Sequence, residues 1–420
     1  MIAATVVGVV VATAAVTPNL VHWLTNVADQ RLVDLDVYRT SGQAVLRGAS
    51  VYDFVTEPPQ LLPFTYPPFA ALLAVPLALV SWPVAQGLMT ALILVALTIT
   101  VGYGFRPLIS RFGDWSPAAW GVLVGLMSFA LPVSDQFRFG QVDLFLVAMC
   151  VADCATKNPR WPRGLLVGLA TAVKLVPGVF LVYLLVTGRR DAAWNAVLTA
   201  AAATLFTLGA LPGDSVDFWF GALWDNSRVG SNNGTANQAF RGFLLRMYWP
   251  DPVTSLVWLL AVALLAYFGF RYARRASLLA ASGTLAQNQA WSAEMTGIAL
   301  TGLLAVLVSP IAWIHHLAWI VLVVGALAGD GRDRARCGAA AGVWLFYVLT
   351  IPWWGLDLIA AGNPGWERAL GRIVQSSYAL GAVALVFVLG IWLIGRIKAG
   401  SSRVPGVPSP NPAGLGTLAP

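Results

Sequence analysis

Residues 83–105 read PVAQGLMTALILVALTITVGYGF and contain no charged side chain. A helix needs about 20 apolar residues to cross the hydrocarbon core of a bilayer, so this run predicts a membrane span. Hydrophobic residues make up 58% of the chain and charged residues 11%, which excludes an ordinary soluble domain. Further apolar runs predict helices near residues 2–20, 116–132, 141–156, 192–211, 252–270, 293–308, 311–328, 337–352 and 373–396.

These runs predict an all-α fold, a polytopic transmembrane helical bundle. We expect a single transmembrane domain over residues 1–398, with about 12 membrane helices when short ones are counted. Residues 399–420 are rich in Pro, Gly and Ser, which predicts a disordered cytoplasmic tail. Residues 2–20 carry no convincing signal-peptide cleavage pattern, so we expect this first helix to be retained.

Basic residues gather in a few loops, and the cytoplasmic loops of membrane proteins are enriched in Lys and Arg. The rule predicts a cytoplasmic position for residues 106–111, 157–163, 189–190, 271–275, 332–336 and 396–398. The net charge of +7 therefore indicates orientation rather than nucleic-acid binding. The remaining connections have fewer positive charges, and we expect them at the extracytoplasmic face of the plasma membrane: 21–66, 132–141, 212–250 and 352–372.

Three short segments are expected to differ from simple spans. Residues 164–187 lie between two basic clusters, which predicts a helical hairpin with Lys174 at its outward apex. Residues 67–80 are apolar but short and interrupted by a proline, which favours an interfacial or re-entrant helix. Residues 36–47 have an amphipathic pattern, which predicts an interfacial helix in the first external loop.

Three polar clusters interrupt the apolar sequence. They are Asp34-Leu-Asp36-Val-Tyr38, the run Asn237-Gln238-Ala-Phe-Arg241, and the pair His315-His316. A membrane interior is costly for ionisable groups, so such groups are kept there mainly for function. The predicted topology places all three clusters outside, together with Lys174, Arg138 and Gln141. We therefore expect these residues to form a single site.

We assign catalysis to Asp34 and to one or both of His315 and His316, and substrate binding to a wider polar set. That set comprises Asp36, Tyr38, Lys174, Asn237, Gln238, Arg241, Arg138 and Gln141. Structural roles are the alternative, because Asp34 can cap a helix and a histidine can bond to a neighbouring helix. Two adjacent histidines and a remote aspartate lack the spacing of a recognised metal motif, so no metal is predicted.

A carboxylate beside cationic and amide groups, in a groove open to lipid and water, suits group transfer from a lipid phosphate. The cations hold the phosphate and stabilise the departing oxygen, while the carboxylate deprotonates an incoming hydroxyl. The sequence has no P-loop and no glycine-rich strand-to-helix turn. A membrane-borne donor is therefore favoured over a nucleotide sugar, and no cofactor is expected.

Several motifs follow one another in a specific order. Asp34-Leu-Asp-Val-Tyr38 precedes Leu-Pro-Phe-Thr-Tyr-Pro-Pro-Phe-Ala, Gly140-Gln-Val-Asp-Leu, Lys174-Leu-Val-Pro, Asn237-Gln-Ala-Phe-Arg-Gly and Ser309-Pro-Ile-Ala-Trp-Ile-His-His. Over residues 30–330 this order resembles the actinobacterial polyprenol-phosphate-mannose-dependent α-1,2-mannosyltransferases, which are membrane glycosyltransferases of the GT-C class. The resemblance implies a GT-C fold, a polyprenyl-phosphate-mannose donor and an outward-facing site. It also implies a glycolipid acceptor (phosphatidylinositol mannoside, lipomannan or lipoarabinomannan) and inversion without an obligatory metal.

The resemblance also carries residue roles. Asp34 matches the family's catalytic aspartate, four residues before the tyrosine, whereas Asp36 occupies a variable position. One of His315 and His316 would contact the donor phosphate or the reacting sugar. The sequence does not choose between the two histidines.

Lys174 and Arg241 are phosphate candidates on electrostatic grounds. Asp143 departs from the family pattern Gly-Gln-x-Asn-Leu, in which an asparagine is expected. Two rival functions stay open: transfer of another sugar, such as arabinofuranose, from the analogous donor, and transport of a lipid or lipid-linked sugar. The sequence does not specify the acceptor, because acceptor choice depends on the shape of the groove.

Overall fold

The computed structural model describes residues 2–25, 32–360 and 363–401. Within these residues the chain is mostly helical, and its only β-type pairings are isolated bridges joining Val55 to Pro63 and Asn237 to Trp313. In the part of the chain that the structure describes, six helices are long and apolar enough to cross a membrane, or up to 8 if each of two bent helix pairs is one span. The prediction of an all-α, polytopic membrane protein is confirmed.

The long spans coincide with predicted runs. They are α1 (Ile2–Leu24), α4 (Trp82–Gly104), α11 (Arg190–Ala210), α14 (Asp251–Ala281), α15 (Gln287–Leu307) and Ser377–Gly400, in which α20 (Ser377–Phe387) and α21 (Ile394–Ser401) flank a π-helical turn. Most residues of α15 are buried, which shows that this helix lies at the centre of the bundle. Few residues of α14 are buried. The predicted tail lies outside the described residues, apart from 399–401 at the end of α21.

The span predicted at 116–132 ends early and is followed by a sharp bend. After α6 (Ser116–Ser128) the chain turns by 80° into α7 (Leu131–Phe139), which was predicted to be a loop. Pro132 lies in the first turn of α7, where a proline is tolerated because the backbone needs no donor. The span predicted at 337–352 is likewise divided into α17 (Arg334–Val348) and α18 (Ile351–Ile359), bent by 50°.

α14 corrects the predicted end of a span at residue 270. The helix continues to Ala281 and carries Arg271, Arg274 and Arg275, which were predicted to lie in a loop. The sequence after Phe270 is rich in Ala, Arg and Leu, which have high helix propensity. This basic cluster is therefore part of a helical surface.

The helix predicted at 311–328 is regular only in its second half. Ile314–Trp319 form a 3₁₀ segment, η6, which is followed by α16 (Ile320–Ala328). The preceding loop is held by hydrogen bonds: Asn237 Oδ1 accepts the backbone N–H of Ala312 at 3.1 Å, and the backbone N–H of Gln238 donates to Ala312 O at 2.6 Å. Because this loop is held extended, the histidine pair lies in the first turn of η6 rather than within an α-helix.

The predicted hairpin consists of α9 (Leu165–Val173) and α10 (Val179–Val186). Its two ends meet the same region of α8 (Asp143–Ala155): Gly164 N–H donates to Asp153 at 2.9 Å, and Arg189 donates to Cys154 O at 3.0 Å. The chain therefore leaves one end of the bundle and returns to it, with Lys174 at the far tip.

α3 (Pro68–Ala78) is the short apolar helix predicted at 67–80. Both of its flanks contact α2 (Val33–Arg47): the hydroxyls of Tyr38 and Tyr66 lie 2.9 Å apart, and Arg39 donates to Val80 O at 3.0 Å. The chain enters and leaves α3 beside adjacent residues of α2, so α3 does not carry it across the bundle.

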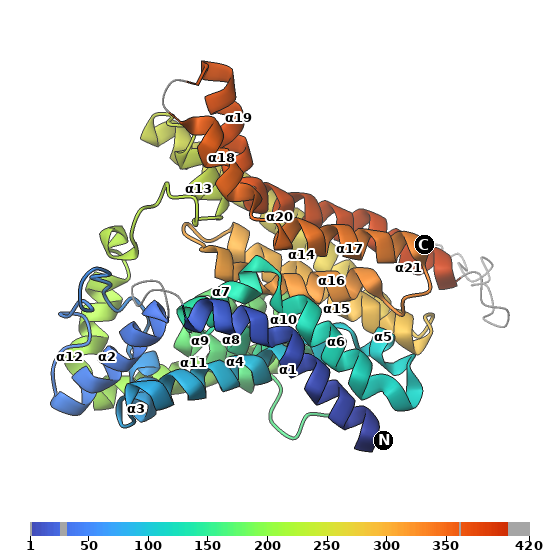
Figure 1. Ribbon diagram of the computed structural model, residues 1–420, viewed down its shortest axis with the longest axis horizontal. Helices are drawn as coiled ribbons and strands as arrows, with labels where there is room; N and C mark the ends of the chain where they lie inside the picture. The colour runs from blue at the N-terminus through green and yellow to red at the C-terminus, as the bar shows by residue number, and fades with distance from the viewer. Residues whose placement is uncertain (1, 26–31, 361–362, 402–420) are drawn as a thin grey trace, which may run out of the picture.

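The bundle has two chemically different ends. The basic clusters lie together at one end, as the charge pattern predicts. Arg111 donates to Gly331 O at 3.0 Å, and Arg396 donates to Asp333 at 2.8 Å. In Figure 1 this end lies on the right, where α5 (Arg106–Ser110) and α21 are found. The opposite end, on the left, carries α2, α3 and α12 (Pro212–Asp217).

Candidate active site

At the end opposite the basic clusters, α2, α7 and η6 enclose a cavity of about 410 Å³. The loop before α3, the 3₁₀ segment η5 (Asn226–Val229) and α18 complete its wall. Its polar lining comprises Asp34, Tyr38, Thr65, Tyr66, Asp135, Arg138, Gln141, Arg228 and His315, and its aromatic lining includes Phe139, Trp313 and Trp353. The predicted residues that meet here are Asp34, Tyr38, Arg138, Gln141 and His315.

Gln141 fixes the carboxylate of Asp34. Its Nε2 donates to Asp34 Oδ2 at 2.7 Å, and its Oε1 accepts from Tyr38 OH at 3.0 Å and from Tyr66 OH at 3.3 Å. An amide has distinct donor and acceptor ends, so the two phenols turn the NH₂ group toward the carboxylate. Burial raises the pKa of Tyr38 well above its ordinary value, so its hydroxyl remains protonated and able to donate.

The pKa of Asp34 is raised to about 6. Burial is the largest cause, and the hydrogen bond from Gln141 and the positive charge of Lys174 act in the opposite direction. A carboxylate with this pKa is ionised at neutral pH and is a stronger base than an exposed aspartate. Asp34 therefore has the acid–base property required for deprotonating a hydroxyl.

Gly140 allows α2 and α7 to approach each other. It ends α7 in the left-handed conformation (φ 69°), and a β-carbon there would lie 2.7 Å from Cβ of Leu35. Glycine is suited to this position because it adopts positive φ without strain and has no side chain to clash. The Gly-Gln pair in the sequence thus joins the two helices and places Gln141 beside Asp34.

A buried charged layer adjoins the cavity. Lys174 Nζ lies 2.7 Å from Asp143 Oδ1 and 2.9 Å from His316 Nε2, and all three side chains are largely inaccessible to solvent. His315 Nε2 is 3.9 Å from Asp143 Oδ2, and His315 itself lines the cavity. The fold thus distinguishes the two histidines: His315 faces the cavity and His316 faces Lys174.

Asp143, His315 and His316 have donor atoms within 4.8 Å of one another, a spacing that is compatible with a metal ion. Sequence spacing did not reveal this group, because Asp143 begins α8 and the two histidines lie on η6, which is distant in sequence but packs against α8. The Lys174 ammonium, however, is at hydrogen-bond distance from both Asp143 and His316, so it already supplies a positive charge between them. Catalysis without a metal stays a prediction.

Asn237 and Gln238 do not reach the cavity, contrary to the prediction. Both are fully buried. Asn237 Oδ1 accepts the N–H of Ala312 at 3.1 Å, while Gln238 donates to Gln375 O at 2.9 Å and accepts from Ala379 N–H at 3.0 Å. These bonds fix the loop that leads into η6, so the two amides position the backbone beside the cavity.

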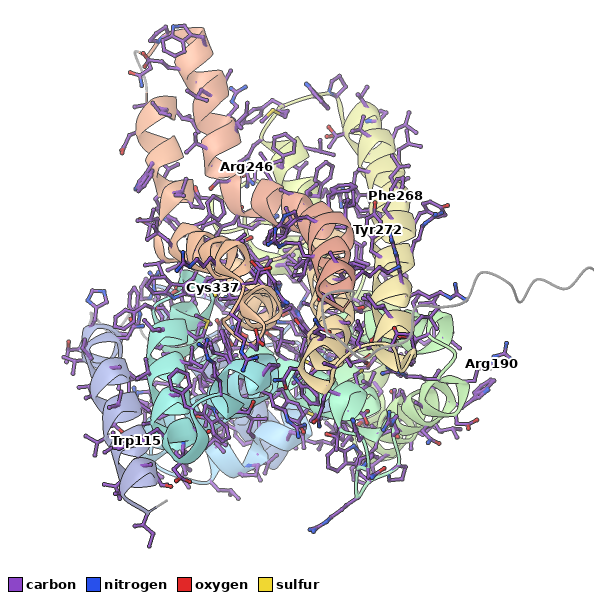
Figure 2. The ribbon with its side chains drawn as sticks, turned by 90° about the vertical axis from the view of Figure 1, so that its right-hand side faces the viewer. Trp115, Arg190, Arg246, Phe268, Tyr272 and Cys337 are labelled. Carbon is purple, nitrogen blue, oxygen red and sulfur yellow. The ribbon has the colours of Figure 1, made fainter. Side chains whose placement is uncertain are left out.

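Arg241 and Asp36 also lie outside the cavity lining. The Arg241 guanidinium, on α13 (Phe240–Leu245), stacks over Trp258 of α14 at 5.2 Å. Nearby Arg246, labelled in Figure 2, is buried and donates to Ser376 at 2.9 Å, so it joins α13 to the start of α20. Asp36 is partly buried on α2, and this burial raises its pKa.

Tyr66, Asp135 and Arg228 are additions to the predicted set. Arg228 donates to Tyr52 O at 2.7 Å and reaches the cavity from η5. Asp135 Oδ1 lies 3.9 Å from Arg138 Nη1 on the same short helix. Tyr66 belongs to the Thr-Tyr-Pro-Pro motif and Asp135 precedes the Gly-Gln motif, so both had a sequence signal, whereas Arg228 lies in a long loop that offered none.

Several buried polar atoms at this cavity have no hydrogen-bond partner. In the described part of the chain, Asp135 Oδ1, Arg138 Nε, Arg228 Nε and His315 Nε2 are buried without a hydrogen-bond partner, as is Asp143 Oδ2 in the adjoining layer. Leaving a buried polar atom unpaired costs about 1–3 kcal/mol. Several such atoms in one cavity indicate a site that a polar ligand completes.

The sequence profile of glycosyltransferase family 87 matches residues 64–310, more than half of the chain. The chain belongs to glycosyltransferase family 87. A polyprenol-phosphate-mannose-dependent alpha-(1-2)-phosphatidylinositol mannoside mannosyltransferase of Mycolicibacterium smegmatis is 30% identical over 387 residues, covering 88% of this chain and 86% of the relative. The protein of the same name from Mycobacterium tuberculosis is 30% identical over 400 residues, covering 90% and 89%.

A third relative, a polyprenol-phosphate-mannose-dependent alpha-(1-2)-phosphatidylinositol pentamannoside mannosyltransferase of Mycobacterium tuberculosis, is 32% identical over 339 residues, covering 76% of this family 87 chain and 72% of the relative. No solved structure matches the chain. The resemblance drawn from the motifs is confirmed at the level of family. Asp34 and His315 fall outside the matched range 64–310, so their roles stay predictions.

Proposed function

We propose that this family 87 glycosyltransferase moves mannose from a polyprenyl-phosphate-mannose donor to a phosphatidylinositol mannoside, forming an α-1,2 linkage with inversion. The names of its relatives support the donor and the acceptor class. The observation that carries the proposal is Asp34, hydrogen-bonded to Gln141 at 2.7 Å in a cavity that also holds Arg138 and Arg228. A base and phosphate-binding cations are the groups that such a transfer needs.

Asp34 acts as the general base. Its carboxylate takes the proton from an acceptor hydroxyl as the hydroxyl oxygen forms a bond to the anomeric carbon. The bond from that carbon to the phosphate oxygen breaks, and the electron pair leaves with the polyprenyl phosphate. One displacement from the face opposite the leaving group inverts the configuration. Gln141, Tyr38 and Tyr66 are positioning residues that orient the base.

Arg138 and Arg228 bind the donor phosphate. Both guanidinium groups line the cavity and have a buried Nε without a partner. Charge-assisted hydrogen bonds from arginine to phosphate are strong and directional. Lys174 forms an ion pair with Asp143 at 2.7 Å, and Arg241 stacks on Trp258. Neither residue is therefore the primary phosphate ligand, although the sequence made both candidates.

His315 contacts the reacting sugar or the phosphate, since its unpartnered Nε2 lies at the cavity wall. Asp143, Lys174 and His316 form the layer behind it and hold it in position. A cavity of about 410 Å³ falls within the range of roughly 300–1,000 Å³ typical of small-molecule sites. It therefore has room for the sugar phosphate, while the polyprenyl chain stays in the bilayer.

We place the cavity at the extracytoplasmic face of the plasma membrane. The basic clusters lie at the opposite end of the bundle, and loops rich in Lys and Arg favour the cytoplasm. A lipid-linked donor suits this position because it reaches the site through the membrane.

The test uses purified full-length protein with polyprenyl phosphate carrying radiolabelled mannose and a panel of phosphatidylinositol mannosides and lipomannan. We expect labelled mannose in one class of glycolipid, removable by an α-1,2-specific mannosidase, and no such product with Asp34→Asn. Transfer of arabinofuranose from the analogous donor, without mannose transfer, would replace the proposed donor. Movement of intact donor across proteoliposomes without any product would favour a transporter instead.

A further inference from the structure

The active-site cavity is smaller than a second cavity of the described structure. An open groove of about 1020 Å³ lies at the basic end of the bundle, between α10, α14 and α21. Its apolar lining comprises Val182, Val186, Ala266, Tyr267, Phe270, Leu278 and Leu279, and its basic lining comprises Arg271, Arg274, Arg275 and Lys398. The groove shares no residue with the cavity that holds Asp34.

The groove is on the outer surface of the bundle. Val182, Tyr267 and Leu278 line it and are 41%, 59% and 47% exposed, as expected of side chains in contact with lipid. The inner face of α14 is distinct: Phe268 and Tyr272, labelled in Figure 2, lie 6.2 Å and 6.3 Å from the ring of Phe387. The groove therefore opens sideways, toward the bilayer.

The depth of the groove matches the boundary between acyl chains and headgroups. α14 has 31 residues, which at 1.5 Å per residue make a helix about 46 Å long. The hydrocarbon core is only about 30 Å thick, so one end of α14 must extend into the headgroup region. The arginines begin after Phe270, at the end of the continuous apolar part of α14, so they lie at headgroup depth when that apolar part spans the core.

The charge of the groove is of one sign. No acidic side chain lines it, and Arg271, Arg274 and Arg275 form no ion pair with a carboxylate of the described residues. Arg274 Nε donates to Val186 O at 3.0 Å, which joins α10 to α14 along the groove. Other arginines at this end are paired, such as Arg189 with Glu294 at 2.6 Å. Within the described residues, these three arginines thus keep positive charge that no carboxylate neutralises.

We infer that this groove binds one anionic phospholipid of the leaflet at the basic end of the bundle. Arg271 and Arg275 hold the headgroup phosphate, and the acyl chains lie along the apolar wall that includes Ala266 and Phe270. Basic pockets between membrane helices favour anionic headgroups, because charge complementarity adds to burial of the chains. This site lies apart from the transfer reaction and holds whether or not the proposed donor is correct.

The test is native mass spectrometry of the purified full-length protein, titrated with dioleoyl phosphatidylglycerol or, separately, dioleoyl phosphatidylcholine. We expect one tight site for phosphatidylglycerol. The double variant Arg271→Gln/Arg275→Gln should bind it about 30-fold more weakly, since each basic residue near an anionic lipid contributes roughly fivefold in affinity. The matched control is Arg332→Gln/Arg334→Gln, two exposed arginines of the same end that lie outside the groove. It loses the same charge and should bind like the wild type.

A second variant separates the groove from general surface charge. Ala266→Trp keeps every arginine but fills the apolar wall, so it should also lose the tight phosphatidylglycerol site. Unchanged binding by Ala266→Trp, or equal weakening in the groove double variant and its control, would overturn the inference and leave the arginines as ordinary orientation signals. Melting temperatures and transfer rates near those of the wild type show that the variants are folded.

Discussion

The two ends of the bundle use buried polar side chains in opposite ways. At the basic end they are fully partnered: Asp153 accepts backbone N–H groups from Gly164 and Val167 at 2.9 Å, and Arg336 donates to Ser292 and to backbone carbonyls. At the cavity end, Asp135, Arg138, Arg228 and His315 keep buried atoms without partners. In the described part of the chain, no such atom belongs to the six basic clusters.

This contrast gives a way to distinguish buried polar side chains that stabilise the fold from those that bind a ligand. Every buried ionisable group is costly in a membrane, so its presence alone does not show its purpose. A group whose hydrogen bonds are all satisfied within the protein stabilises the fold. A group that lines a cavity and has a buried atom without a partner is available to a ligand. Each prediction below tests this distinction.

The largest effect is expected for Asp34. Asp34→Asn keeps the size of the side chain and removes the base, so transfer should fall by about 10²–10⁴-fold. The matched control is Asp36→Asn, on the same helix but outside the cavity lining, which should stay within about twofold because no reacting group contacts it. Initial rates with saturating donor and acceptor measure both. Near-normal transfer by Asp34→Asn would remove it as the base.

One ion pair at each end of the bundle provides the next comparison: the pair at the cavity end is buried, and the pair at the basic end is partly buried. Lys174→Met leaves Asp143 buried without its partner at 2.7 Å, which should destabilise the protein by about 3–5 kcal/mol. Adding Asp143→Asn removes the stranded charge and should restore most of the melting temperature, but not transfer. The equivalent pair at the basic end is Arg189 and Glu294.

The double variant Arg189→Met/Glu294→Gln should keep its specific activity once folded protein is normalised. Melting curves in detergent and transfer rates measure the two properties separately. If Lys174→Met/Asp143→Asn transferred mannose at the wild-type rate, the charged layer behind His315 would only stabilise the fold, as the Arg189–Glu294 pair does. The two ends would then not differ in this respect.

The affinity for the donor tests whether the cavity arginines bind its phosphate, and the expected effects are smaller than that of Asp34→Asn. Arg138→Gln and Arg228→Gln each remove charge-assisted hydrogen bonds worth about 1.5–3 kcal/mol, so the KM for the donor should rise roughly 10–100-fold. Arg241→Gln should change the KM for the donor by less than about twofold, because a cation stacked on Trp258, outside the cavity lining, contributes little to a remote site. The reverse order, with Arg241 dominant, would contradict the assignment made from the cavity.

The sequence predicted the parts of the structure that membrane insertion dictates. Runs of apolar residues located most spans, and the placement of Arg and Lys sorted the ends of the bundle. The hairpin was predicted because two basic clusters lie too close in sequence for two full spans. The same charge pattern predicts that Lys174 lies at the end of the bundle where it contacts Asp143 and His316.

The contacts of individual polar side chains could not be predicted from the hydrophobic and charge patterns. Asn237, Gln238 and Arg241 belong to a conspicuous motif, yet Asn237 and Gln238 are bonded to the backbone of segments distant in sequence. Arg228 reaches the cavity from a loop with no periodic pattern. Side-chain direction also depends on local backbone geometry, and both histidines lie in the 3₁₀ segment η6 rather than in the predicted α-helix. Hydrophobic pattern carries no information on any of these features.

The smallest predicted effect is a pH dependence that belongs to the cavity end alone. Asp34 must be ionised to act, and its pKa is about 6, so kcat/KM should fall as the pH drops through that value. Between pH 7 and pH 5 the ionised fraction, and with it the rate, should decrease about tenfold.

The hydrogen bond from Gln141 lowers this pKa, so Gln141→Leu should move the midpoint to higher pH. The variant Glu294→Gln, at the other end, should leave the midpoint unchanged. A rate that is flat from pH 5 to pH 7, or a midpoint that moves equally in both variants, would show that the titration does not arise from a carboxylate held by Gln141.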